Sequence, residues 1–472
     1  MIKDDGRNGF GRFDVVVVGA GPAGIAASVR AAESGARVAL VDDNPSPGGQ
    51  IWRKESRLDE TRRSESPRGE SKGRANSEAR SWFERLQASK VLVMSQTRIF
   101  DQPRSGALSA ECGKQAFELE YSRLVLATGA RELFLPFPGW TLPGVMGAGG
   151  LQAQVKSGLP VRGKKVIVAG TGPLLLAVAA FLKEHGAEVP MILEQTTWSR
   201  MFRFAAVLLP HPEKLLQAFQ LRRQLSGVRM VTNGWVIEVH GQAHGEGHRD
   251  AKLQAVTFSA GGSEGNQAKN NETRKETLPC DYLACSYHLV PNIELAALLG
   301  CRIKQGFVEV DDFQRTSIES VFCAGEPTGI GGVELALVEG EIAGLAAAEQ
   351  ITLNQIALDQ TKDVRGLLRR SARLRRLSGA MDWAFQLQPG LRHLPQPETI
   401  ICRCEDVTWS QLNRHQGWRS AKLQTRCGMG PCQGRICGAA VRFLLDWEPQ
   451  SVRPPVFPVR LGALAGGGHG AT

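Results

Sequence analysis

Five of the ten cysteines lie close together near the C-terminus, with spacing that suits a metal centre. Cys402 and Cys404 form a C-x-C pair, and Cys427, Cys432 and Cys437 follow within the same module. Thiolates hold structural zinc and iron–sulfur clusters. Because the first residues lack the apolar segment of a secretory signal, such a module favours a metal centre over a disulfide framework.

A Gly-rich turn near the N-terminus predicts a dinucleotide site. The run Phe13–Gly19 is typical of a buried strand, and it leads through Gly19-Ala-Gly21-Pro22-Ala-Gly24 into an Ala-rich helix. Gly19 permits the tight turn, Gly21 lets the backbone approach a pyrophosphate, and Gly24 lets the helix lie close to the sheet. Asp42 ends the next strand about twenty residues further on, where a carboxylate can accept ribose hydroxyls.

A second strand–turn–helix unit begins at Lys165 and repeats the first incompletely. It contains Gly170 and Gly172, but Leu175 occupies the third glycine position, and Glu194 ends its second strand. A bulky Leu175 is expected to push helix and strand apart, since the third glycine normally permits their close packing. Whether this second nucleotide pocket is functional, altered or empty stays open.

Two further pairs each end a predicted strand: Thr128-Gly129 and Gly325-Glu326. In a parallel sheet such strand ends converge on the ligand crevice. Either pair alone is a common strand terminator. Their order along the chain, with one fingerprint before each pair, favours a functional interpretation.

This order of features resembles the flavoprotein family of glutathione and thioredoxin reductases. The resemblance implies an α/β fold with two Rossmann-like dinucleotide-binding domains, the second inserted in the first, and a bound FAD. The positions that match the family's FAD site are Gly19, Gly21, Pro22, Gly24, Asp42, Gln50, Thr128, Gly129, Gly325 and Glu326, with Glu326 replacing the usual Asp. Gly170 and Gly172 match the second site, for NAD(P) or another nucleotide. The family's redox Cys-x-x-Cys is absent from the sequence, so disulfide reduction is not expected.

The C-terminal module narrows the resemblance. Residues 401–408 and 425–437 resemble a bacterioferritin-associated-ferredoxin-like [2Fe–2S] domain, which closes the α subunits of bacterial opine, hydroxyproline and related amine dehydrogenases and one of the subunits of hydrogen cyanide synthase. Residues 44–52 and 325–337 are also similar to that group. The resemblance implies an electron-transfer subunit of a heteromeric dehydrogenase that oxidises an amino acid, imino acid or opine. Its expected partner is a separately encoded flavoprotein dehydrogenase subunit, and a small ferredoxin-like subunit is a further candidate.

A [2Fe–2S] cluster needs four thiolates, so one of the five cysteines is not a ligand. We predict Cys402, Cys404, Cys427 and Cys432, because Cys437 is expected to lie a turn inside the last helix and only to pack. Whether Cys437 replaces Cys427 as a cluster ligand stays open. Basic residues beside the thiols would raise the reduction potential, and glycines would free backbone amides for the sulfurs: Arg403, Arg426, Arg435, Gly428 and Gly430. A zinc site is the alternative, although C-x-C suits one tetrahedral ion poorly.

No catalytic residue is assigned. The histidines His211, His288 and His393 lack a nearby acid and nucleophile pattern, and Cys280, Cys285, Cys301 and Cys323 are expected to be packed thiols. Two other functions therefore stay open. One is a self-contained NAD(P)H-dependent ferredoxin-type reductase, which needs a working second nucleotide site. The other is a non-catalytic scaffold that carries a cluster or zinc.

The length of the chain limits how it can be divided into domains. The 472 residues are too many for one hydrophobic core, so several domains are expected. We predict an FAD domain over 1–150 and 305–356, with a flexible insertion over 54–80, and a second dinucleotide domain over 151–304. A helical connector over 357–396, a small helical [2Fe–2S] domain over 397–447 and an extended tail over 448–472 are predicted to follow.

The net charge of +10 lies largely in Arg-rich stretches such as 365–376. No aromatic residues interleave there to stack bases, so a partner-facing surface is expected rather than nucleic-acid binding. The longest apolar stretch, Leu174–Leu182, is shorter than a membrane span of about 20 residues. A cytoplasmic protein with reduced thiols is expected.

Overall fold

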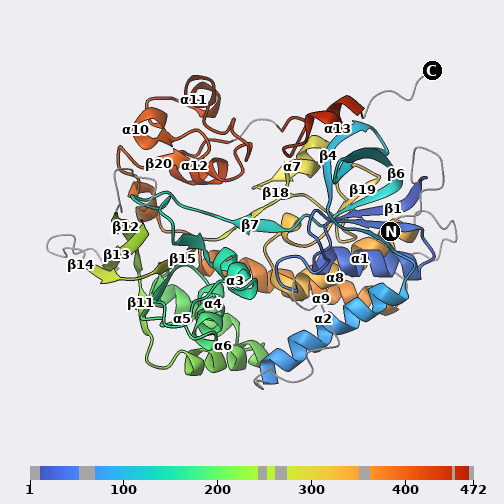
Figure 1. Cartoon of the computed structure of the whole chain (residues 1–472). Helices are drawn as coiled ribbons and strands as arrows, with labels where there is room; N and C mark the ends of the chain where they lie inside the picture. Colours follow the sequence, from blue (N-terminus) through green and yellow to red (C-terminus); the bar gives the residue numbers. More distant parts are fainter. Residues whose placement is uncertain are drawn as a thin grey trace. The chain divides into compact units, whose positions relative to one another are not determined.

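The computed structural model describes residues 11–52, 70–242, 252–260, 274–349, 362–448 and 452–466. The chain forms two compact units (Figure 1). The first comprises Met1–Arg131, Pro291–Ser378 and Ser451–Thr472, and the second comprises Glu132–Val290 and Gly379–Gln450. The chain thus leaves the first unit and returns to it, which confirms the predicted inserted arrangement. The finer domain boundaries stay predictions.

The first unit is built on a seven-stranded sheet in the order β3-β2-β1-β6-β5-β4, with β19 paired to β6. Its parallel part contains β1 (Phe13–Val18), β2 (Val38–Val41), β3 (Leu92–Met94), β19 (Val321–Cys323) and the second half of β6 (Gln115–Leu126). The first half of β6 pairs antiparallel with β5 (Ala107–Cys112), which pairs with β4 (Thr97–Arg104). One long strand therefore belongs to both parts.

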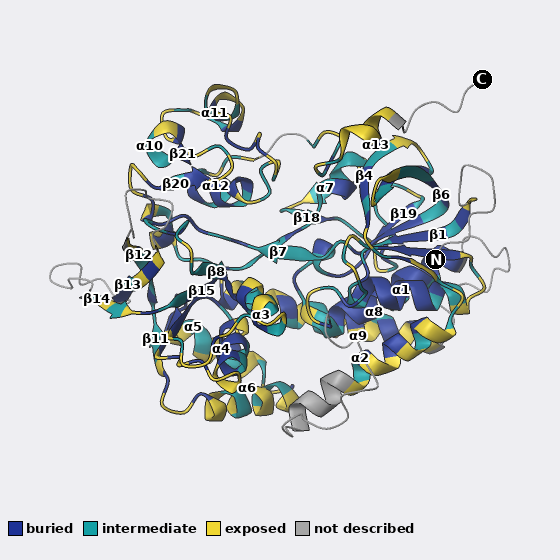
Figure 2. Ribbon diagram, viewed as in Figure 1, coloured by how far each residue is buried: buried dark blue, intermediate teal, exposed yellow. Residues whose placement is uncertain are grey.

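Helices α1 (Pro22–Glu33) and α8 (Gly332–Glu349) pack closely in the first unit, and both are buried along most of their length (Figure 2). A Cβ at Gly340 or Gly344 would lie 2.2 Å from the carbonyl oxygen of Ala23 or Ala27. Two glycines four residues apart thus let the helix backbones touch. Helix α9 (Lys362–Ala384) lies within the segment predicted to be a helical connector, and its Leu367 packs with α8.

The sequence prediction was wrong for two segments of the first unit. Helix α2 (Glu70–Ala88) covers the second half of the expected flexible insertion, because Ala79, Phe83 and Leu86 recur on one face and pack into the core. Residues 53–69 lie outside the described residues. The tail, expected to be extended, contains α13 (Leu461–Gly466), and the amide of Val456 donates to the carbonyl of Phe100 at 2.8 Å.

Short elements complete the first unit. They are α7 (Glu294–Leu298), β17 (Ile303–Lys304), β18 (Phe307–Val308) and the 3-10 helix η2 (Glu326–Thr328). Strands β7 (Ala130–Glu132) and β16 (Leu289–Pro291) pair where the chain passes between the units.

The second unit contains a parallel five-stranded sheet in the order β11-β10-β9-β15-β8. Its strands are β11 (Arg229–Thr232), β10 (Met191–Glu194), β9 (Val166–Gly170), β15 (Tyr282–Ser286) and β8 (Val145–Gly147), and its helices are α3 (Ala148–Lys156), α4 (Leu174–Glu184), α5 (Trp198–Val207) and α6 (Pro212–Gln224). The expected hairpin at 240–276 is an antiparallel sheet of β12 (Gly234–Gln242), β13 (Lys252–Ala260) and β14 (Arg274–Pro279). The loops between these strands lie largely outside the described residues.

The cysteine module belongs to the second unit and is small and helical, as predicted. It contains β20 (Ile400–Cys402), β21 (Val407–Thr408), α10 (Trp409–Leu412), α11 (Trp418–Thr425) and α12 (Cys437–Leu445), preceded by the 3-10 helix η4 (Pro389–His393). Its own small core includes Leu412, Trp418 and Val441.

Among the residues that the structure describes, no helix is both long and apolar enough to cross a bilayer.

Candidate functional site

The first fingerprint lies at the carboxyl edge of the parallel sheet in the first unit. Val18 pairs with Val41 and with Leu126, and Cys323 also pairs with Leu126. The residues that follow these strands therefore share one edge, and they are Gly19, Asp42, Thr128, Gly129, Gly325 and Glu326. The sequence predicted this convergence because parallel strands end on the same side.

Each glycine of the fingerprint has a separate steric reason. Gly19 has φ +105°, and an added Cβ would lie 2.2 Å from the carbonyl oxygen of Ala127. A Cβ at Gly24 would lie 1.7 Å from the carbonyl oxygen of Gly19, so the helix start touches the turn. A Cβ at Gly21 would meet no atom within 4 Å. The backbone is therefore open at Gly21, where the fold places a pyrophosphate.

Asp42 is held against the turn. Its carboxylate accepts a hydrogen bond from the Ala20 amide at 2.5 Å and two from Asn44, each at 2.7 Å. The loop after it folds back on the fingerprint, since the Gly48 amide donates to the Ala20 carbonyl at 2.7 Å. Gln50 lies in this loop with an exposed side chain.

The strand-end pairs are fixed by residues that sequence reasoning missed. The Thr128 hydroxyl donates to the carbonyl of Asn292 at 2.6 Å, and the side-chain amide of Asn292 donates back to the Thr128 carbonyl at 2.9 Å. Glu326 accepts a hydrogen bond from the Gly332 amide at 3.0 Å. Asn292 is distant from Thr128 in the sequence, and no local pattern identified it.

A buried carboxylate supports the Gly325 turn. Glu339 is 1% exposed, accepts hydrogen bonds from the Gly325 amide and the Thr328 hydroxyl at 2.9 Å each, and pairs with Arg375 at 2.9 Å. Burial raises the pKa of Glu339, and Arg375 opposes that shift. One arginine of the Arg-rich connector therefore has a structural role, which the charge pattern did not indicate.

The second fingerprint differs in how its helix begins. Gly170 has φ +140°, and a Cβ there would lie 1.9 Å from the Ser286 carbonyl oxygen. Helix α4 begins after Pro173, whereas α1 includes the matching Pro22. Leu175 is 1% exposed and packs in the core beneath the sheet. Leu175 is therefore a core residue at the position where the first fingerprint has Gly24.

Glu194 is buried on the second turn, with 2% of its surface exposed. It accepts hydrogen bonds from the Gly172 amide at 2.7 Å, the Thr171 hydroxyl at 3.0 Å and the Thr196 amide at 2.8 Å. Burial raises the pKa of Glu194, and the amides of Thr196 and Gly172 oppose that shift.

The structure brings the cysteines of the C-terminal module together. The sulfurs of Cys402, Cys427 and Cys437 all lie within 4.8 Å of one another. Cys432 is hydrogen bonded to Cys437 and Cys404 through their side chains. The expected position of Cys437 was wrong: Cys437 is the first residue of α12 rather than a turn inside it, and its sulfur lies with those of Cys402 and Cys427.

Four of these thiols line one cavity of about 180 Å³. They are Cys402, Cys404, Cys432 and Cys437, and the other lining residues are Phe134, Trp140, Val145, Arg403 and Ile436. Cys427 is fully buried and is not among the described lining residues. Three apolar lining residues come from far upstream in the sequence, where no pattern marked them.

The thiols perturb one another strongly. Hydrogen bonds from Cys427 and Cys437 lower the pKa of Cys402 to about 2, and one from Cys437 lowers the pKa of Cys432 to about 5. The contact with Cys402 raises the pKa of Cys427 to about 12. The pKa of the other two cavity thiols, Cys404 and Cys437, is raised instead, so the clustered sulfurs do not share their protons evenly.

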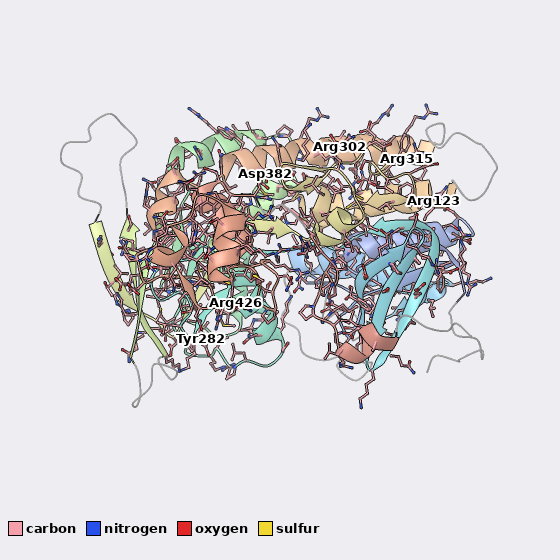
Figure 3. All side chains as sticks on the ribbon, turned by 90° about the horizontal axis from the view of Figure 1, so that it is seen from above. Arg123, Tyr282, Arg302, Arg315, Asp382 and Arg426 are labelled. Atoms are coloured by element: carbon pink, nitrogen blue, oxygen red, sulfur yellow. The ribbon has the colours of Figure 1, made fainter. Side chains whose placement is uncertain are left out.

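The residues around the thiols play more varied roles than predicted. The Gly428 amide is hydrogen bonded to the Cys402 sulfur, as expected, whereas a Cβ at Gly430 would lie 2.4 Å from the Cβ of Cys404. Arg426, labelled in Figure 3, pairs with Glu405 at 2.7 Å. Of the three predicted basic residues, Arg403 lines the cavity.

The four cysteines expected to be packed are buried, which confirms that prediction: Cys280, Cys285, Cys301 and Cys323. Burial raises the pKa of each, Cys280 to about 12. Such thiols do not ionise near neutral pH and offer no nucleophile.

The sequence of this chain matches a known protein family over most of its length. A family described as pyridine nucleotide-disulphide oxidoreductase matches residues 13–350. The chain belongs to this family. It is therefore an FAD-dependent oxidoreductase, as the resemblance implied.

Relatives of this oxidoreductase match along nearly the whole chain. It is 32% identical to an opine oxidase subunit of Agrobacterium tumefaciens, over 96% of this chain and 91% of that protein. It is 31% identical to the hydrogen cyanide synthase subunit HcnB of Pseudomonas aeruginosa, over 89% of this chain and 90% of that protein.

Solved structures share the fold. L-proline dehydrogenase from P. horikoshii has a TM-score of 0.61 at 18% identity, covering 96% of this chain and 79% of that chain. Thioredoxin reductase from T. acidophilum has a TM-score of 0.51 at 19% identity, covering 72% of this chain and 99% of that chain. These likenesses support the α/β architecture of this oxidoreductase.

Proposed function

We propose that this chain is the electron-transfer subunit of a heteromeric dehydrogenase that oxidises an amino acid, an imino acid or an opine. It binds FAD at the first fingerprint and a [2Fe–2S] cluster in the C-terminal module. The observation that carries the proposal is the cavity lined by four thiols in a member of a flavoprotein family. The relatives named above are subunits of an opine oxidase and of hydrogen cyanide synthase, which supports a heteromeric assembly.

The FAD site fits the residues of the first unit. The open backbone at Gly21 leaves room for a pyrophosphate, and Asp42 sits where a ribose is bound. Bound FAD supplies two-electron chemistry and the cluster one-electron chemistry. Residues Thr128 and Glu326 orient the turns at the other strand ends, so the chain's own role is to bind and position the cofactors.

The cluster ligands are Cys402, Cys404, Cys432 and Cys437, with Cys437 in place of the predicted Cys427. These four residues line one cavity, whereas Cys427 is fully buried and is not among the described lining residues. The Gly428 amide stabilises the Cys402 thiolate. A fully buried Cys427 that only packs fits the rule that a cluster takes four thiolates.

Substitution of single cysteines tests the ligand set. The variants Cys432→Ser, Cys437→Ser and Cys427→Ala are made with Cys112→Ser, a half-buried thiol of the first unit, as the matched control. Iron and sulfide content and the EPR signal of the dithionite-reduced protein are measured after anaerobic, iron-replete expression. We expect Cys432→Ser and Cys437→Ser to lose the signal, and Cys427→Ala and Cys112→Ser to keep it.

The opposite outcomes are distinguishable. A signal that survives in Cys437→Ser and disappears in Cys427→Ala would restore the ligand set predicted from the sequence. Stoichiometric zinc without iron in the unsubstituted protein would refute the cluster. Thermal unfolding of each variant separates loss of ligation from loss of the fold.

The partner is a separately encoded flavoprotein subunit that activates the substrate C–H bond. Burial raises the pKa of the thiols of Cys280 and Cys285, so these two are poor nucleophiles near neutral pH. The exposed arginines of α9, including Arg369 and Arg370, offer a basic docking surface for an acidic face of that subunit.

The partner proposal is tested by dye reduction with the purified single chain across D- and L-amino acids, proline derivatives and opines. We expect no turnover from the chain alone and turnover after the partner subunit is added. Charge reversal at Arg369 and Arg370 should weaken the complex without lowering FAD content. Robust turnover by the single chain would refute the proposal.

A further inference from the structure

The second nucleotide crevice is covered by the chain itself. Residues Gln195–Thr197, directly after β10, are each at most 8% exposed. The segment that covers them follows α9, about 190 residues later in the sequence. Both segments belong to the second unit.

A chain of hydrogen bonds holds this segment in place. The Thr171 hydroxyl oxygen lies 3.3 Å from the Phe385 carbonyl oxygen, and the Gln195 side-chain amide donates to the Gln386 carbonyl at 3.3 Å. In return, the Gln388 amide donates to the side-chain oxygen of Gln195 at 2.9 Å. The Gln388 side chain also donates to the Gln195 carbonyl and to Asn233.

An aromatic ring lies against the Gly-rich turn. A Cβ at Gly172 would lie 3.8 Å from the ring of Phe385. The same ring packs edge-on against Phe204, with 5.2 Å between centroids. Phe385 is 7% exposed, so its ring is largely removed from water. The ring therefore packs against both the Gly-rich turn and Phe204.

These contacts occupy the positions that a dinucleotide needs. In this fold the pyrophosphate lies on the Gly-rich turn and the ribose lies at the acid that ends the second strand. Here Phe385 lies at Gly172, and Gln388 is bonded to the residue after Glu194. The matched positions of the first unit differ, because Gly21 is open and Asp42 is half-exposed.

We propose that Phe385–Gln388 is the built-in occupant of the second nucleotide crevice, which excludes NAD(P)H and anchors the thiol module. The anchoring follows from what comes next in the chain. Leu391 and Leu394 enter the core beside Trp235, and Trp140 donates from Nε1 to the Ile400 carbonyl at 2.6 Å. Cys402 follows two residues later. The inference needs neither the flavin nor the partner, so it stands apart from the proposed function.

The first test is nucleotide binding by the full-length holoprotein. Isothermal titration with NADH, NADPH and ADP-ribose is expected to give no binding to the unsubstituted chain. Binding of any of them that Glu194→Gln abolishes would show an open second crevice and overturn the proposal. FAD and iron content of the same samples show that the protein is loaded, which keeps this result independent of the cofactor assignments.

The second test is hydrogen exchange in the double variant Phe385→Ala/Gln388→Ala. Exchange at the backbone amides of Thr196 and Ile401 should rise at least about tenfold, which corresponds to roughly 1.4 kcal/mol. The matched control is Gln386→Ala, because Gln386 uses only its backbone carbonyl in the crevice and its side chain is exposed. Unchanged exchange in the double variant would overturn the anchoring role.

Discussion

Replacement of Gly21 by leucine should remove FAD without harming the fold. Gly21 is the N-cap of α1 with φ −76° and ψ −176°, an extended conformation that any residue adopts. An added Cβ meets no atom within 4 Å. The free energy of unfolding of the apoprotein should therefore change by no more than about 0.5 kcal/mol, as at an ordinary surface position.

The same side chain fills the space through which a pyrophosphate approaches the backbone. A hydrogen bond to a charged group contributes about 1.5–3 kcal/mol. Loss of two such bonds would weaken FAD binding by about 3–6 kcal/mol, or roughly 10²- to 10⁴-fold in Kd. The assay is FAD content after purification, followed by titration of the apoprotein with FAD and by urea unfolding.

Substitutions at two other glycines serve as controls for Gly21→Leu. A Cβ at Gly24 would lie 1.7 Å from the Gly19 oxygen, so Gly24→Ala should destabilise the apoprotein itself by about 1–3 kcal/mol or more. Gly366 is exposed on α9 with nothing near its Cβ, so Gly366→Leu should keep both FAD and stability. Full FAD content in Gly21→Leu, or a loss of stability like that of Gly24→Ala, would refute the reasoning.

Three further predictions concern stability. Burial raises the pKa of Asp382 (Figure 3) to about 6. Between about pH 4 and 6 the folded state therefore keeps a proton that the unfolded state has lost. The free energy of unfolding should fall by about 1–2 kcal/mol as the pH rises through this range, a value reduced for the partial exposure of the carboxyl group. In urea unfolding, Asp382→Asn should remove that slope, and an unchanged slope would assign it elsewhere. Trp140→Phe removes the donor of the Ile400 carbonyl and should cost about 1–3 kcal/mol in thermal unfolding. Gly344→Val drives a side chain into the carbonyl of Ala27 and should lower the unfolding midpoint, whereas an unchanged midpoint would contradict the close packing of α1 and α8.

The first fingerprint could be predicted from the sequence because its determinants are local. A buried strand, three glycines and Asp42 lie within one short stretch, and their spacing sets both the turn and the start of α1. The convergence of Thr128 and Gly325 was also predictable, since parallel strands end at one edge. The supporting Glu339 and Asn292 were not, because they reach these turns from distant parts of the chain.

In the cysteine module, the sequence predicted the cluster of thiols but not the direction in which each thiol points. The sequence located the thiols within one module and indicated a metal centre. It placed Cys437 inside a helix, but α12 begins at Cys437, and that start turns the thiol toward Cys402 and Cys432. The cavity is also lined by Trp140, which belongs to the first segment of the second unit, far upstream of the thiols.

The sequence by itself determined the chemistry available to this protein: the dinucleotide turns, the thiols and the family. The tertiary structure alone decided how that chemistry is used at the second turn. Gly170, Gly172 and Glu194 keep the pattern of a nucleotide site, yet Phe385 and Gln388 lie on it. No local spacing can reveal such an occupant, because the contact joins segments about 190 residues apart and exists only once the chain has folded.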